Sequence, residues 1–261
     1  MSRIVSRLAA IAVFLIAQAG LVNGAEVKVF STIGVQTALE ELAPKFEQAT
    51  GNKLNLTWAT AAILAKRVQA GKTTDLMVLT KQSLDALAKD NKATAGADAV
   101  FASAGMAVVV KKGAPRPDIA TADAFKQAPL NAKTIANSDP AAGGASGVYF
   151  AKLLERKRIA DQMKAKTKHP PPSGNAANLV VAGEAELAIQ QEPEVMSVAG
   201  IDMVGPLPAD LNNITVYAAG IGTGSQQSVP ANALIRFLHS PEAQAVFKLK
   251  GIKPADAPKE T

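Results

Sequence analysis

The chain has no cysteine and only two histidines among its 261 residues. Without cysteine it can form neither a disulfide bond nor the acylated cysteine of a lipoprotein. The histidines, His169 and His239, lie far apart in the sequence, unlike the closely spaced ligands of a zinc site. The sequence also lacks a recognisable catalytic triad and any pair of carboxylates that would demand catalysis. We therefore predict no metal site and no cofactor.

A large excess of charge of one sign is also missing. The 28 lysines and arginines outnumber the 22 aspartates and glutamates only slightly, and they are scattered apart from one cluster at Lys164–His169. Nucleic-acid-binding domains usually concentrate basic residues on one face. The mild excess of positive charge argues against a nucleic-acid partner, and it is compatible with a small acidic ligand.

Long hydrophobic runs are absent except at the N-terminus. Arg3 and Arg7 precede an apolar run from Leu8 to Ala19, and small residues close the segment at Gly24. This order is typical of a secretory signal peptide, and the run is too short for a good membrane span. We predict that residues 1–24 are a signal peptide, with cleavage after Ala25 as the alternative, and that the protein is exported to the periplasm. Loss of both arginines lowers the formal net charge from +6 to +4.

The stretch from residue 27 to residue 51 predicts a strand, a tight polar loop and a helix. Apolar residues at 27–30 form the strand, small residues break it at 31–34, and apolar residues then recur at helical spacing until Gly51. The free N–H groups and the dipole of a helix N-terminus attract anions. An ordinary turn without a ligand would have the same pattern. The candidate ligand contacts in this loop are Ser31, Thr32 and Gly34.

The same alternation of strand and helix continues twice. Strands are predicted at Leu54–Trp58 and Asp75–Leu79, and a helical pattern follows each of them. A βαβαβα order indicates a parallel sheet with helices on both faces. Such sheets bind ligands at the carboxyl ends of their strands. The loops that lie there are Ser31–Gly34, Ala59–Ala62 and Thr80–Gln82.

A second α/β unit follows. A strand at Met106–Val110 leads to a short strand at Lys133–Ala136, then to a glycine-rich loop at Ala141–Gly147 and a helix from Val148. Glu186–Ile189 and Ile214–Ala219 are further predicted strands. Two crossings between the units suit two α/β lobes with mainly parallel sheets and a ligand cleft between them. We predict that residues 25–107 and 217–261 form lobe 1 and that residues 108–216 form lobe 2.

Several of these segments, in this order, carry a family resemblance. They are VFSTIGVQTALEELAPKFEQATG, WATAAILAKRVQAGKTTDL, DPAAGGASGVYFAKLL, GEAELAI with the polar pair after it, and PANALIRFLHSPEAQAVFKLKGI. Together they resemble the periplasmic molybdate-binding proteins of ABC importers. The resemblance implies a type II periplasmic-binding-protein fold that closes on a small anion, and an importer permease in the membrane as a partner. We expect a monomer.

The resemblance also implies where ligand donors lie. The family binds its oxyanion with hydroxyl and backbone N–H groups, and its first-loop serine corresponds to Gly34 in this chain. The family's tyrosine corresponds to Gln191, and its serine-rich second loop reads Thr-Ala-Ala here. These changes leave the ligand open between a molybdate-like oxyanion, sulfate, tungstate and an organic carboxylate. The remaining ligand positions that the resemblance implies are Thr60, Ala61, Ala145, Ser146, Ser173 and Gly174.

An alternative function is enzymatic. Lys81 follows a predicted strand beside Thr80, where a cation would suit a carboxylate ligand, although a solvated lysine would look the same. Periplasmic aconitate isomerases resemble this binding-protein family, and their reaction is an allylic proton shift that requires a base. If the chain is such an enzyme, the catalytic candidates are Lys81, His169 and Glu192. His169 is expected to be solvent-exposed.

Overall fold

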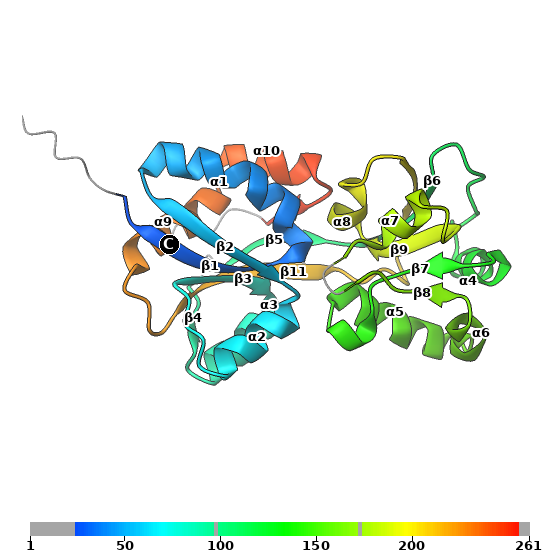
Figure 1. Cartoon of the computed structure of the whole chain (residues 1–261), viewed down its shortest axis with the longest axis horizontal. Coiled ribbons are helices and arrows are strands. Elements are labelled where there is room, and N and C mark those ends of the chain that lie inside the picture. The colour runs from blue at the N-terminus through cyan, green and yellow to red at the C-terminus, as the bar shows by residue number, and fades with distance from the viewer. Residues whose placement is uncertain (1–23, 97–98, 172–173, 256–261) are drawn as a thin grey trace, which may run out of the picture.

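Two β-sheets, each covered by helices on both faces, organise the chain into two lobes (Figure 1). The computed structural model describes residues 24–96, 99–171 and 174–255. The predicted signal peptide lies outside these ranges, apart from Gly24, so it stays a prediction. No helix within the described ranges is long and apolar enough to cross a membrane.

The first sheet has seven strands and draws on both ends of the chain. These strands are β1 (Glu26–Thr32), β2 (Lys53–Ala59), β3 (Leu76–Thr80), β4 (Ala93–Thr94), β5 (Val100–Ala104), β11 (Thr215–Gly222) and β12 (Lys253–Pro254). Their order is β12-β5-β11-β3-β1-β2, and β4 pairs with β11. The apolar pattern of the sequence predicted β1, β2 and β3, and these three strands are parallel as expected.

Helices cover this sheet on both sides. One face packs on α1 (Gln36–Thr50), α9 (Ser228–Leu238) and α10 (Pro241–Leu249), and the other face packs on α2 (Ala61–Gln69) and α3 (Lys81–Lys89). Helix α1 ends at Gly51, whose left-handed backbone (φ 74°) provides the helix stop predicted from the sequence. A short 3-10 turn, η1 (Ile33–Val35), precedes α1.

The second sheet has five strands from the middle of the chain. They are β6 (Met106–Lys111), β7 (Ile135–Ala136), β8 (Thr167–Lys168), β9 (Leu187–Gln191) and β10 (Ile201–Pro206), in the order β10-β6-β9-β7-β8. One core contains α4 (Ala122–Asn131), α5 (Ala145–Arg156) and α6 (Ala160–Lys164). The opposite core contains α7 (Ala176–Val181) and α8 (Glu192–Met196).

Both sheets are mixed, whereas the sequence predicted mainly parallel ones. The antiparallel pairs all involve β5, β6, β10, β11 or the short strands β4 and β12. Strands β5 and β10 were not predicted. Strand β10 lies at the edge of its sheet, contains a register shift between Met203 and Gly205, and ends at Pro206. Such interruptions are tolerated at an edge, and they hide the alternation that identifies a strand in the sequence.

The chain crosses between the sheets twice. Gly105 separates β5 from β6, and residues 207–214 connect β10 to β11. Each crossing strand therefore begins two residues before the lobe boundary that the sequence predicted, since β6 begins at Met106 and β11 at Thr215. The segments on either side of each crossing lie at the junction seen in the centre of Figure 1. The exact division into lobes stays a prediction.

Candidate functional site

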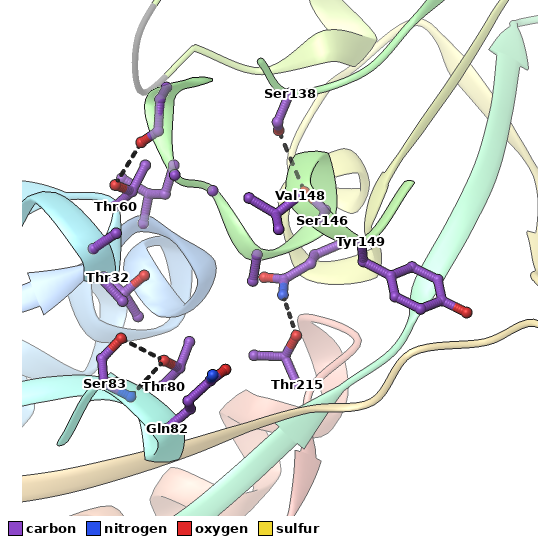
Figure 2. A pocket seen from close by; sticks show the side chains of 18 of the residues that line it. Thr32, Thr60, Thr80, Gln82, Ser83, Ser138, Ser146, Val148, Tyr149 and Thr215 are labelled. Carbon is purple, nitrogen blue, oxygen red and sulfur yellow. Dashed lines mark hydrogen bonds between the residues drawn. The ribbon is translucent and has the colours of Figure 1, made fainter. Parts of the chain in front are cut away.

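A cavity of about 910 Å³ opens between the two lobes. The first lobe contributes residues that follow β1, β2 and β3, and the second lobe contributes the start of α5, the 3-10 turn η2 (Pro140–Ala142) and the end of β9. Figure 2 shows Thr32 and Thr60 on one side of it and Ser138 and Ser146 on the other. The carboxyl ends of the predicted strands therefore do meet at one place, as the sequence analysis expected.

The first turns of α2, α3 and α5 line this cavity. Thr60 and Thr80 are the N-caps of α2 and α3, and the hydroxyl of each accepts a hydrogen bond from a backbone N–H three residues later, at 3.3 Å. The other N–H groups of a first turn have no partner inside the helix. Three such turns around one cavity give it a positive potential that favours an anion.

Most of the predicted contact residues line the cavity. Those that do are Thr32, Thr60, Ala61, Thr80, Lys81, Ala145, Ser146, Gly174 and Gln191. Those that lie elsewhere in the described chain are Ser31, Gly34, His169 and Glu192. Ser173 lies outside the described residues. Two helices also begin earlier than predicted, since α3 starts at Lys81 and α5 at Ala145, and this places both residues in a first turn.

The residues that lie off the cavity have other surroundings. Ser31 is fully buried, and its hydroxyl donates to the Thr32 carbonyl at 3.4 Å. His169 is exposed, and its Nδ1 lies 3.0 Å from the carbonyl oxygen of Asn137. Glu192 sits against the backbone at Gly251, and burial raises the pKa of its carboxyl. Neither His169 nor Glu192 therefore lies where a ligand in the cavity would be.

Gly34 is buried under a hydrogen-bonded group of side chains. The Tyr217 hydroxyl donates to Gln191 Oε1 at 2.5 Å, and Gln191 Nε2 donates to the Thr215 hydroxyl at 2.7 Å. A Cβ atom on Gly34 would lie 2.4 Å from the Tyr217 hydroxyl and 2.7 Å from Gln191 Oε1. The serine that the related family has at this position would therefore clash with Tyr217 and Gln191 in this chain, because Tyr217 occupies the space.

Three lysines line the cavity, of which the sequence analysis found only one. Lys81 makes an ion pair with Asp85 one helical turn later, at 2.6 Å, with both side chains about half exposed. The other two are Lys66 on α2 and Lys152 on α5, which face the cavity from opposite lobes. Helical spacing could have identified both, because Lys66 lies four residues after Ala62 and Lys152 seven residues after Ala145, each on the same helix face as a residue of the predicted ligand loops.

Glu194 is a further cavity residue that was not predicted from the sequence. It lies in α8, lines the cavity, is half-buried and accepts a hydrogen bond from the Gln190 side-chain amide. Burial raises the pKa of its carboxyl to about 7, against the opposing effect of that hydrogen bond. Gln191 and Glu194 are three residues apart, so both face the same side of a helical turn. Helix α8 has only five residues, which is too short for this spacing to be recognised in the sequence.

Comparison with known proteins identifies the family. A model of the bacterial extracellular solute-binding proteins matches residues 27–253, and the chain belongs to this family. An aconitate isomerase from Pseudomonas sp is 32% identical over 235 residues, which cover 88% of each chain. The molybdate-binding protein ModA of Escherichia coli K12 is 25% identical over 242 residues, 91% of this chain and 93% of that protein.

The solved structures agree on the fold. The periplasmic molybdate-binding protein of Azotobacter vinelandii superposes with a TM-score of 0.70 at 19% identity, covering 88% of this chain and all of that one. The two-lobed periplasmic-binding-protein fold predicted from the sequence is therefore confirmed, as is the resemblance to molybdate-binding-type proteins. Members of this family bind solutes outside the cytoplasm, and that coarse function holds for this chain.

Proposed function

We propose that this protein is the solute-binding component of an ABC importer and that its ligand is a small di- or tricarboxylate. The observation that carries the proposal is the combination of three helix N-termini with Lys66, Lys81 and Lys152 around one cavity. Lysine ammonium groups attract carboxylates as mobile point charges, and the N–H groups of a first turn donate hydrogen bonds to an oxygen of the same ligand.

The size and chemistry of the cavity favour a carboxylate over a tetrahedral oxyanion. At about 910 Å³ it lies in the range of clefts that hold organic ligands. A compact oxyanion needs a close ring of short donors, and this chain has no hydroxyl at Gly34, while Gln191 is already engaged by Tyr217 and Thr215. Each lost neutral hydrogen bond weakens binding by about 0.5–1.5 kcal/mol.

Thermal unfolding with equal concentrations of trans-aconitate, citrate, molybdate and sulfate tests this proposal. We expect a tricarboxylate to raise the melting temperature most, because at equal concentrations the ligand that binds most tightly stabilises the folded state most. A ligand at 100 times its dissociation constant adds about 2.7 kcal/mol of stability. Lys81→Gln should reduce this shift, while Lys89→Gln, at the far end of the same helix and outside the cavity, should leave it unchanged. Strong stabilisation by molybdate alone would show that the proposal is wrong.

The second candidate function is isomerisation of cis- and trans-aconitate. It is supported by the 32% identity to a protein named aconitate isomerase across most of both chains, and it uses the same carboxylate-binding cavity. The reaction moves a proton from the methylene carbon of the substrate to its vinyl carbon, and the double bond shifts accordingly.

Proton NMR in deuterated buffer distinguishes the two candidates. If trans-aconitate is converted to the cis isomer, the chain is an isomerase, and deuterium in the methylene group shows that the transferred proton exchanges with the solvent. If the ligand binds and stays chemically unchanged at stoichiometric protein concentration, the isomerase candidate is wrong and the binding proposal stands alone.

A further inference from the structure

Three acidic side chains line the cavity, and two of them have structural roles, in an ion pair and in a turn. Asp85 pairs with Lys81 at 2.6 Å. Asp139 caps the turn η2, where its Oδ1 accepts from the Ala141 N–H at 2.9 Å. The third is Glu194, and among the described residues that line the cavity there is no histidine. Among the carboxyl groups that line the described cavity, Glu194 is therefore the candidate for acid–base chemistry.

Glu194 is held in one orientation by its surroundings. The Ala176 N–H donates to Gln190 Oε1 at 2.7 Å, so the amide nitrogen of Gln190 must face Glu194, and it donates to Glu194 Oε2. The Ser197 hydroxyl and the Asn175 side-chain amide both donate to the backbone carbonyl of Glu194. A carboxyl fixed by α7, β9 and α8 together keeps its position when a ligand enters, as a catalytic group must.

Few other charges surround this carboxyl. From β11, Tyr217 faces it with a hydroxyl that donates to Gln191, and burial raises the pKa of Tyr217 well above its ordinary value, with the charge of Glu194 as a second cause. From β9, Gln190 and Gln191 are neutral, and on α8 itself Glu192 is not among the residues that line the cavity. The cations are the three lysines that line the same cavity. The raised pKa of Tyr217 keeps its hydroxyl protonated at neutral pH, whereas a carboxyl with a pKa of about 7, as at Glu194, is partly ionised there and suited to proton transfer.

We propose that Glu194 is the base that removes a proton from the methylene carbon of a carboxylate bound in the cavity and returns it to the other end of the allylic system. This inference rests on the isomerase candidate given above. In the first half, the methylene C–H bond breaks, a new O–H bond forms on Glu194, and the released electron pair becomes the new C=C bond.

The second half restores the enzyme. The electrons of the original C=C bond, delocalised toward the neighbouring carboxylate, take the proton back from Glu194 at the former vinyl carbon. Substrate and product are isomers, so no oxidant or reductant is consumed. Lysine ammonium groups around the cavity stabilise the negative charge that develops on the carboxylate oxygens in between.

The substitution Glu194→Gln tests the inference, with Glu192→Gln as the matched control on the same helix but outside the cavity. General base catalysis is worth about 10²- to 10⁴-fold, so we expect Glu194→Gln to lower kcat at least 100-fold. Its calorimetric affinity for trans-aconitate should be equal or higher, because one negative charge has left the cavity. In the wild type and in Glu192→Gln, kcat/KM should rise with pH through about 7, because the base must be ionised.

The outcomes separate the two levels of proposal. A wild-type protein that binds trans-aconitate and leaves it unchanged overturns the isomerase candidate, and the role of Glu194 with it. An active wild type whose Glu194→Gln variant keeps its kcat within threefold overturns the role of Glu194 alone. If Glu194→Gln fails to fold, Glu194→Asp replaces it. The shorter side chain of aspartate moves the carboxylate away from the substrate, so kcat should fall while kcat/KM still rises with pH. An unaltered kcat would refute the inference.

Discussion

At the scale of single residues, Gly34 explains why the site departs from its family pattern. The related family has a serine donor at this position, but in this chain the Tyr217–Gln191 pair fills the space where a serine side chain would lie. The glycine, the glutamine and the buried tyrosine therefore fit one another as a set. The two substitutions were visible in the sequence, whereas Tyr217 was not identified, because it lies far along the chain in β11.

The raised pKa of Glu194 predicts a pH-dependent stability. A carboxyl whose folded pKa is about 7, against an ordinary 4.5, binds its proton more tightly in the folded state. Its stabilising contribution is fully present below about pH 4.5 and is lost as the pH rises through about 7. One pKa unit corresponds to about 1.4 kcal/mol, so the shift from 4.5 to about 7 sets an upper bound of roughly 3–4 kcal/mol on the loss.

Urea unfolding at pH 5 and pH 8 measures this effect. We expect the free energy of unfolding of the wild type to fall between these two values by more than that of Glu194→Gln. The difference between the two proteins isolates Glu194 from the other titrating groups. Equal changes in both proteins would contradict the prediction.

At the scale of elements, the sequence predicted those with a clear apolar pattern and missed those in which the pattern is interrupted or too short. The apolar faces of α1, β1, β2 and β3 are long enough to show their periodicity. Helix α8 has five residues, fewer than two turns, so its periodicity cannot be recognised. This is why Glu192, which directly follows the strand, was named as a candidate base, whereas Glu194 is the one in the cavity.

The start of α5 shows how caps decide which groups face the ligand. Gly144 is the N-cap, and a Cβ atom there would make ordinary contacts of 3.7 Å with Ser138 and 3.9 Å with Thr60. Gly147 is different, because a Cβ atom would lie 2.3 Å from the Ser138 carbonyl oxygen. The sequence indicated a glycine-rich anion loop, but only the packing shows that Gly147 is required by the fold and Gly144 lies on the cavity.

We predict that Gly144→Val weakens carboxylate binding more than Ser146→Ala does. Valine would add bulk beyond Cβ at the cavity wall opposite Thr60, whereas alanine removes only the hydroxyl that donates to Ser138 at 3.3 Å. Loss of that neutral hydrogen bond is worth about 0.5–1.5 kcal/mol. Calorimetric titration of both variants with trans-aconitate measures the difference. An unchanged affinity in Gly144→Val would remove this loop from the binding site.

At the scale of the whole molecule, the two lobes touch directly at residues that line the cavity. The Thr60 hydroxyl donates to the Ala142 carbonyl of the second lobe at 3.0 Å, while it also accepts from the Ile63 N–H as the N-cap of α2. One side chain thus joins the start of a helix in one lobe to the turn η2 in the other. Such a contact stabilises the closed arrangement of the lobes, in which the cavity is formed from both sides.

Removing this hydroxyl should make ligand release faster. We expect Thr60→Val to lose the contact between the lobes together with the helix cap, and to raise the dissociation rate of a bound tricarboxylate roughly three- to tenfold, the equivalent of one hydrogen bond. Thr121→Val is the matched control, because Thr121 caps α4 in the same way, away from the cavity. It should lose about 0.5–2 kcal/mol of stability with an unchanged dissociation rate. Thr60→Ser keeps both hydrogen bonds and should behave as the wild type in stopped-flow release measurements. Equal release rates for Thr60→Val and Thr60→Ser would show that this contact does not hold the lobes together.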